Sequence, residues 1–200
     1  MPKLILLRHG QSLWNLKNRF TGEVDIDLTV QGEAEALNAG KLLKDFQIDI
    51  AFTSVLNRAI HTLNIILIEI GLNIPVVPSP ALNERNYGEL QGLNKAETAK
   101  KYGAENVLHW RRGFSTRPPG GESLKDTFDR VVPFYLKEIY PCLKQGKTVL
   151  IVAHGNSLRA LIMHLQGLNE QEIESVEIAT GAPKAYEFSS DMKLIKSNYL

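Results

Sequence analysis

The sequence predicts a three-layer α/β fold, in which a mostly parallel β-sheet carries helices on both faces. Short apolar runs at 4–7, 50–53 and 148–153 alternate with longer segments of helical periodicity, which is the pattern of strands joined by crossover helices. The composition is that of an ordinary globular chain, with 44% hydrophobic and 22% charged residues. At 200 residues, the chain is expected to form one domain, spanning 1–200.

Local signals mark where the individual elements begin and end. After the first strand, Thr29 is a candidate N-cap for a helix that runs to about Phe46. After the second strand, Ser54 is expected to cap a helix that Gly71 ends. Further along the chain we expect a short strand at 76–77 with Leu82, short helices over 95–102 and 107–110, a helix from 122–123 to about 140, a helix over 156–165, and a closing hairpin of 185–188 with 192–195.

Residues 84–122 interrupt the regular alternation of strands and helices. The segment contains only short helical patterns and is broken by the run Pro118-Pro119-Gly120-Gly121, a strong turn signal. We therefore expect residues 84–122 to form a cap or substrate-binding segment of the domain.

Charge and cysteine content exclude several classes of protein. The 23 Lys and Arg residues balance 22 Asp and Glu residues, so no overall field favours nucleic acid or an anionic membrane surface as a partner. No apolar run approaches the roughly 20 residues that span a bilayer. The single Cys142 forms no internal disulfide and belongs to no metal-binding pair. A reducing compartment, the cytoplasm, is the expected location.

Two strands of the predicted sheet end in the same way. Arg8-His9-Gly10-Gln11-Ser12 follows the first strand, and Ala153-His154-Gly155-Asn156-Ser157 follows the strand at 148–153. Because ligands of open α/β sheets bind at the carboxyl ends of the strands, His9 and His154 are expected at one edge of the sheet.

Arginines are expected to join the two histidines at this edge. Arg8 precedes His9, and Arg58 lies in the first turns of the helix that follows the second strand. Arginine forks bind tetrahedral oxyanions, and a neutral histidine is a nucleophile, so the cluster predicts phosphoryl transfer through phosphohistidine. A serine hydrolase stays open as an alternative, since residues 155–159 partly match a nucleophile elbow.

Several separated blocks make almost the whole chain similar to a known family. At Arg8-His9-Gly10 the sequence resembles the histidine phosphatase superfamily, and the blocks together narrow the resemblance to the cofactor-dependent phosphoglycerate mutases. The resemblance implies the fold of that family. The blocks lie at 6–15, 18–22, 53–63, 82–88, 90–98, 110–114 and 153–161.

The resemblance also implies a role for individual residues. His9 is implied to be the phosphorylated nucleophile, and Glu84 the general acid and base. Arg8, Arg58 and His154 are implied to hold the oxygens of the transferred phosphoryl group, in line with catalysis by positioning and electrostatics. The positions that match the family's substrate-binding residues are Asn15, Thr21, Gly22, Tyr87, Lys95, Arg111, Arg112, Gly155 and Asn156.

The implied reaction interconverts 3-phosphoglycerate and 2-phosphoglycerate in glycolysis and gluconeogenesis. It is primed by 2,3-bisphosphoglycerate, needs no metal, and has phosphorylated three-carbon acids as its only partners. Two rival functions stay open. One is a phosphomonoesterase of the same superfamily, and the other is a phosphate-sensing or scaffold protein on a degenerate fold of this type.

Two departures from the family pattern affect the expected oligomeric state and the expected access of water to the site. The short connection from Phe114 to Glu122 replaces a longer stretch that contributes to subunit contacts in many relatives, so a monomer and a homo-oligomer are both open. Relatives also continue beyond the position of Leu200 with a tail that helps to cover the site. A shorter cover is expected to admit water and to allow hydrolysis as a minority reaction.

Overall fold

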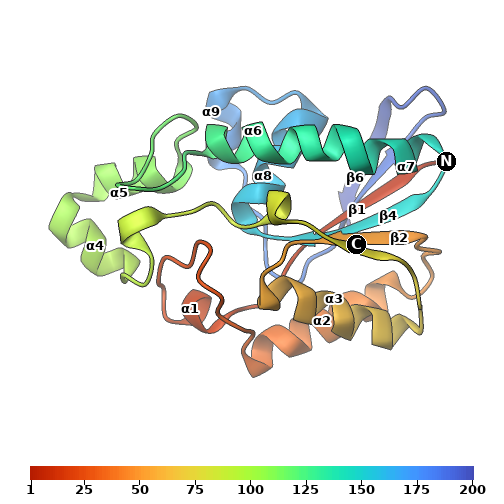
Figure 1. The fold of residues 1–200 in the computed structure, drawn as a ribbon, viewed down its shortest axis with the longest axis horizontal. Helices are drawn as coiled ribbons and strands as arrows, with labels where there is room; N and C mark the ends of the chain where they lie inside the picture. Colours follow the sequence, from red (N-terminus) through yellow and green to blue (C-terminus); the bar gives the residue numbers. More distant parts are fainter.

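One mixed sheet of six strands organises the chain (Figure 1). The structure is a computed structural model that describes residues 1–200. The strand order is β3-β2-β4-β1-β5-β6, with parallel pairing from β3 to β1 and antiparallel pairing of β5 and β6. The prediction of a mostly parallel sheet is confirmed. The strands are β1 Lys3–Arg8, β2 Ile50–Thr53, β3 Val76–Pro78, β4 Thr148–Ala153, β5 Lys184–Phe188 and β6 Leu194–Tyr199.

Helices cover both faces of the sheet, as Figure 1 shows. On one face lie α2 (Val30–Leu43) and α3 (Asn57–Ile70). The other face carries α6 (Leu124–Phe134), α7 (Tyr140–Lys144), α8 (Gly155–Gln166) and α9 (Glu170–Ser175). Beyond the carboxyl ends of β1 and β4 lie α1 (Leu13–Leu16), α4 (Lys95–Tyr102) and α5 (Ala104–Arg112).

The central strands supply both halves of the core. Successive side chains of a strand point to opposite faces, so Leu4 and Leu6 join the apolar cluster under α6 and α8, whereas Ile5 and Leu7 join the cluster under α2 and α3. All four side chains are buried. The continuous apolar run at the start of the chain is therefore explained by a strand that is covered on both faces.

Most of the local signals act as predicted. The Thr29 hydroxyl accepts from the amide of Gly32 at the start of α2, and Gly71 ends α3 in the left-handed conformation with φ 67°. The predicted helix from 122–123 to about 140 begins as expected, but residues 135–139 widen into a π-turn. That turn ends two residues before Pro141, which has no N–H to donate to a carbonyl four residues earlier.

Two predicted details are wrong. Ser54 is not the N-cap of α3; that position belongs to Leu56, because an extended stretch after β2 delays the helix by two residues. Leu82 lies in a single 3₁₀ turn over Pro80–Leu82, not in a strand, because Ser79 caps the turn and Pro80 suits its first position. Helices α1 and α9 are present although the sequence did not predict them.

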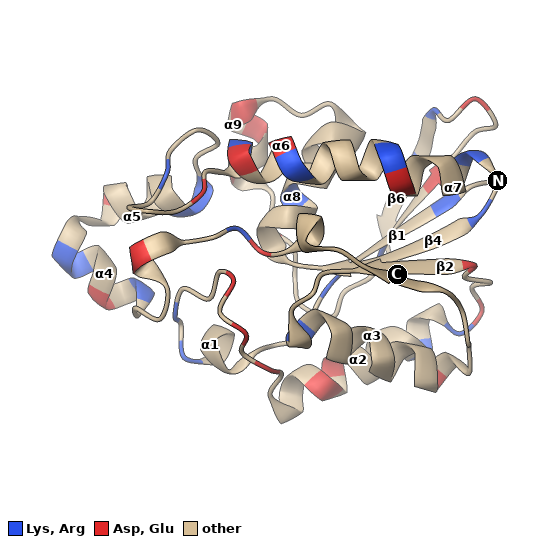
Figure 2. Ribbon diagram, in the orientation of Figure 1, with Lys and Arg blue, Asp and Glu red and all other residues tan.

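Charges of both signs are mixed along the outer elements. Figure 2 shows lysine or arginine next to acidic residues on α4 and on α6. None of the helices combines the length and the apolar character that a membrane-spanning segment requires.

Candidate active site

Both histidines lie at the same edge of the sheet, as the paired strand endings predict. Strands β1 and β4 are parallel neighbours, and Arg8 is in register with Ala153. His9 and His154 follow these two residues directly, which brings the centroids of their rings to 4.9 Å. The arrangement comes from the sheet itself, because the carboxyl ends of adjacent parallel strands meet at one edge.

His9 is oriented as a neutral nucleophile. Its Nδ1–H donates to the carbonyl oxygen of Gly10 at 2.7 Å, which leaves the lone pair on Nε2. Nε2 accepts from Nε of Arg58 at 3.3 Å. Burial, together with the charges of Arg58 and Arg8, holds the pKa of His9 well below its usual value near 6.5. The ring is therefore neutral at pH 7, with the lone pair of Nε2 beside a guanidinium.

Glycine is required at position 10 for a steric reason. A Cβ atom on Gly10 would lie 2.1 Å from the carbonyl oxygen of Gly32, in the first turn of α2. The backbone of the loop after β1 therefore packs directly against the backbone of α2. This contact fixes the carbonyl that orients His9.

Two arginines surround the nucleophile, and they differ in how fully they are paired. Arg58 is fully buried and donates to the carbonyl oxygens of Gly22 and Val24 at 2.7 and 2.9 Å. Burial lowers its pKa to about 10, so it stays charged at neutral pH. Arg8 donates through Nη1 to Ile178, but its buried Nε has no partner. An unpaired donor next to the nucleophile suits an anionic ligand.

Glu84 lies in the same pocket with one oxygen held and the other free. Its Oε1 accepts from the backbone amides of Arg85 at 2.8 Å and Asn156 at 3.0 Å. Its Oε2 makes no hydrogen bond and lies 3.6 Å from the position of a Cβ on Gly155, another residue of the pocket wall. A carboxyl group fixed in this way can exchange a proton with a bound ligand.

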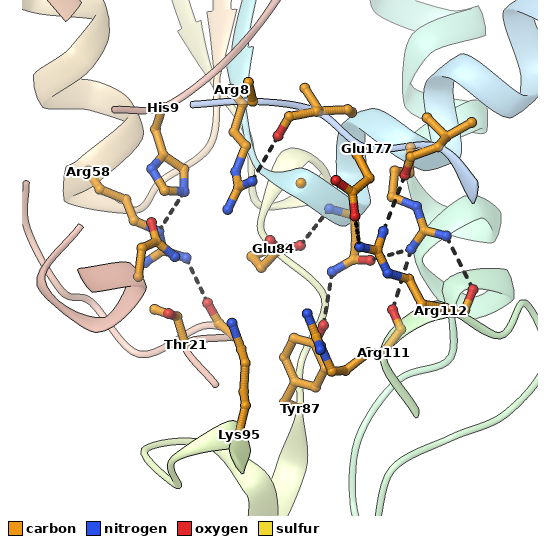
Figure 3. A pocket seen from close by; sticks show the side chains of 18 of the residues that line it. Arg8, His9, Thr21, Arg58, Glu84, Tyr87, Lys95, Arg111, Arg112 and Glu177 are labelled. Atoms are coloured by element: carbon orange, nitrogen blue, oxygen red, sulfur yellow. Dashed lines mark hydrogen bonds and ion pairs between the residues drawn. The ribbon is translucent and has the colours of Figure 1, made fainter. Parts of the chain in front are cut away.

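The structure collects the predicted residues around one cavity of about 530 Å³ (Figure 3). Every residue of the predicted site except His154 lines it. His154 is fully buried and lies behind the wall. Arg8, His9 and Arg58 lie on one side of the cavity, whereas Lys95, Tyr87 and Arg111 approach from the other. Residues that line the cavity without having been predicted are Arg19, Arg159, Val176, Glu177, Ile178, Ala179 and Tyr199.

The second side of the cavity carries a separate group of cations. Lys95 begins α4, and Arg111 and Arg112 end α5. Burial lowers the pKa of Lys95, and Arg112 forms an ion pair with Glu177. The cavity thus has one cationic region around the nucleophile and a second one on the segment 84–122. Such a pocket suits a ligand with two acidic ends.

Two buried arginines that support this second group were not predicted. Arg85 donates to the carbonyl oxygen of Arg111 at 2.9 Å. Arg159 donates to the carbonyl oxygen of Arg112 at 3.2 Å and to Oδ1 of Asn156 at 3.0 Å. Positive charge at a helix C-terminus is favourable, so both guanidiniums hold the end of α5 in place. The only signal in the sequence is that Arg159 follows Asn156 by about one helical turn.

The other three histidines lie outside the cavity. His61 pairs with Asp27 at 3.0 Å. His109 is exposed beside Glu105, and His164 packs between the rings of Phe128 and Tyr135. No group of three or more His, Cys, Asp or Glu side chains is arranged to hold a metal ion.

The buried histidines predict how stability depends on pH. The pKa values of His9 and His154 in the folded protein lie well below 6.5, mainly because of burial, whereas in the unfolded chain they are near 6.5. Below pH 6.5 the unfolded state therefore binds more protons. We expect the free energy of unfolding to fall as the pH drops through 6.5 and to level off about one pH unit above it, with a slope of up to about 1.4 kcal/mol per pH unit for each histidine.

Denaturant unfolding between pH 5.5 and 7.5 measures this slope. Replacing His154 with glutamine should reduce the slope, whereas His109→Gln, at an exposed position, should leave it unchanged. An equal slope in all three proteins would contradict the assignment of neutral buried histidines.

Comparison with known proteins agrees with the geometry. Residues 4–198 match the family described as "Histidine phosphatase superfamily (branch 1)". A 2,3-bisphosphoglycerate-dependent phosphoglycerate mutase of Cytophaga hutchinsonii is 58% identical over 200 residues, which are 100% of this chain and 94% of the relative. The enzyme of the same name from Nitrobacter hamburgensis is 56% identical, over 94% of this chain and 92% of its own.

Solved structures share the fold. A mycobacterial glucosyl-3-phosphoglycerate phosphatase in complex with VO₃ superimposes with a TM-score of 0.86 at 26% sequence identity, over 100% of this chain and 97% of that one. The match of the family to almost the whole chain and the identity to the two curated relatives lead to the same assignment. The chain belongs to the histidine phosphatase superfamily, branch 1, and within it to the family of 2,3-bisphosphoglycerate-dependent phosphoglycerate mutases.

Proposed function

We propose that this protein interconverts 3-phosphoglycerate and 2-phosphoglycerate through a phosphorylated His9, in glycolysis and gluconeogenesis. The observation that carries the proposal is the position of His9 and Glu84 in one cavity between two groups of cations. The relatives that are 56–58% identical bear the name of this activity.

The residues support a phosphoryl transfer in two directions. Nε2 of His9 attacks the phosphorus atom, and the bond from phosphorus to the hydroxyl oxygen of the sugar acid breaks. Protonated Glu84 gives its proton to that leaving oxygen. In the reverse direction the Glu84 carboxylate takes the proton from a hydroxyl group of the sugar acid. The oxygen of that hydroxyl attacks the phosphorus of phospho-His9, and the bond from phosphorus to Nε2 breaks. The guanidinium groups of Arg8 and Arg58 stabilise the oxygens of the transferred group.

The pocket also fits 2,3-bisphosphoglycerate as the priming ligand. When bound, this compound supplies the phosphoryl group for His9. The unpaired Nε of Arg8 is a donor available to one phosphate. Lys95 and Arg111 are available to the acidic groups at the other end, beside Arg112, which pairs with Glu177. A mutase must retain the bisphosphorylated compound while it reorients, and two cationic regions serve that purpose.

A coupled assay tests the function directly. We expect purified protein to convert 3-phosphoglycerate into 2-phosphoglycerate, with a rate that rises strongly when a trace of 2,3-bisphosphoglycerate is added. Release of inorganic phosphate, measured in the same reactions, should be the smaller flux. If phosphate release exceeds isomerisation at saturating bisphosphoglycerate, the protein is a phosphomonoesterase of the superfamily, which shares the first half-reaction and ends with water. If neither reaction is detected, the hypothesis of a phosphate-sensing or scaffold protein is favoured.

The arginines at the end of α5 should decide between retention and hydrolysis. Replacing Arg111 with alanine removes a charged hydrogen-bonding partner worth about 1.5–3 kcal/mol, so we expect KM for 3-phosphoglycerate to rise more than tenfold. The hydrolysed share of turnover should rise as well. Arg117→Ala is the matched control, because Arg117 lies on the same segment but pairs with Asp126 outside the cavity. Equal effects of the two substitutions would contradict the role of Arg111.

Three further properties belong to the same proposal. Residues 84–122, which contribute α4, α5 and Glu84, act as the cap of a single domain over 1–200. The location is the cytoplasm, in keeping with a lone Cys142. The partners are phosphorylated three-carbon acids, with no nucleic acid and no membrane, and the protein works without a metal as either a monomer or a homo-oligomer.

A further inference from the structure

A serine outside the cavity wall is bonded to one of the two central histidines. Ser54 follows β2 and is fully buried. Its Oγ lies 2.7 Å from Nε2 of His154, although the two residues are 100 positions apart in the chain. Neither residue lines the cavity. The Ser54 hydroxyl, which does not cap α3, is therefore bonded to a histidine directly behind the cavity wall.

The hydrogen of the Ser54 hydroxyl indicates the direction of this contact. Oγ of Ser54 accepts from the amide of Leu56 at 3.2 Å, and Nε2 of His154 is the one acceptor that its single hydrogen meets. Accepting from an Nε2–H instead would leave that buried hydrogen without a partner. Burial, followed by the charges of Arg58, His9 and Arg8, holds the pKa of His154 well below 6.5, so its ring carries one proton. With the Ser54 hydrogen directed at Nε2, that proton is on Nδ1.

The other nitrogen of His154 has no partner. Nδ1 is buried without a hydrogen bond, and the same is true of Nε of Arg8. A buried donor without an acceptor costs free energy and requires an explanation. The two donors come from the ends of adjacent strands, on residues next to His9 in the chain or in space. One anion held at His9 would satisfy both.

We propose that Ser54 is a positioning residue that holds neutral His154 in the Nδ1–H form, so that Nδ1 donates to the phosphoryl group at His9. The proposal rests on the proposed phosphoryl transfer. It differs from a packing role, because Ser54 acts through the location of one proton.

Nuclear magnetic resonance of ¹⁵N-labelled histidine rings tests the proton directly. We expect His154 of the unmodified protein to give the signature of a single Nδ1-protonated tautomer, and Ser54→Ala to lose that single form. Thr53→Val is the matched control, because the neighbouring Thr53 hydroxyl is equally buried but donates to the carbonyl of Val152. An Nε2-protonated ring in the unmodified protein, or an unchanged spectrum in Ser54→Ala, would overturn the proposal.

Kinetics separate positioning from general support of the fold. Losing one hydrogen bond of ordinary net strength corresponds to about a tenfold change, so kcat of Ser54→Ala should fall about tenfold, with KM for 3-phosphoglycerate within twofold. In a His154→Ala background the same substitution should have no further effect. A further tenfold loss in that background would overturn the proposal, as would a tenfold loss in Thr53→Val.

The proposed function and the role of Ser54 can be tested separately. If the unmodified protein does not isomerise phosphoglycerate, the proposed function is wrong, while the ring spectra still decide the role of Ser54. Orthovanadate provides an activity-independent probe of the anion site. Its dissociation constant should increase about tenfold in Ser54→Ala and stay unchanged in Thr53→Val, and equal binding by all three proteins would count against a donor at Nδ1.

Discussion

We expect the replacement of His9 with alanine to abolish both the phosphoenzyme and turnover. The unmodified protein should take up one acid-labile phosphoryl group from 2,3-bisphosphoglycerate, and His9→Ala should take up none. No other histidine lines the cavity, since His154 lies behind its wall. Because removal of a nucleophile costs about 10⁴-fold or more in rate, isomerisation should fall below detection in a coupled assay.

The control for this experiment also removes one histidine. His109→Ala removes an exposed ring that does not line the cavity and should label and turn over as the unmodified protein does. Retention of an acid-labile label in His9→Ala would show that another residue carries the phosphoryl group. Such a result would refute the nucleophile assignment even if turnover were lost.

The second large effect is expected for Glu84→Gln. The glutamine keeps one oxygen to accept from the amides of Arg85 and Asn156, so the local structure should persist. The other oxygen is replaced by an NH₂ group, which cannot exchange a proton with the substrate. General acid and base catalysis contributes about 10²–10⁴-fold, and kcat should fall by that factor with little change in KM.

Glu89→Gln is the control for the loss of a carboxylate on the same segment. Glu89 lies in the short turn Gly88–Leu90 and does not line the cavity. Measurement of kcat at neutral pH should show the loss only in Glu84→Gln. Normal kcat in the Glu84 variant would mean that Glu84 only accepts backbone hydrogen bonds.

The parallel part of the sheet could be predicted from the sequence because the local strand and helix patterns there match the burial that the fold imposes. The runs at 4–7 and 149–153 are apolar throughout, and both are covered on two faces. The prediction of a helix start was wrong where a contact with a residue distant in sequence replaced the local capping hydrogen bond. Ser54 has the chemistry of an N-cap, but its hydroxyl bonds to His154, and the helix begins after Leu56.

The residues of the site also fall into a group that the sequence pattern predicts and a group that it does not. His9 and His154 could be placed together from the residues alone, because repeated strand endings imply a shared edge of the sheet. Glu84 carries no such pattern, since it lies in an irregular segment, and only the resemblance to a family marked it. Arg85 and Arg159 were missed because they act on backbone carbonyls of α5, and a contact between distant segments leaves no trace in local spacing.

The place of β1 in the sheet has a consequence for the newly made chain on the ribosome. β1 lies between β4 and β5, so both of its partners are synthesised long after it. Until residues 148–153 emerge, a strand that is apolar on both faces has unpaired edges, and such strands favour aggregation. The nucleophile therefore follows a strand that leaves the ribosome well before the two strands that enclose it, so truncation before residue 148 should yield insoluble fragments instead of partly active ones.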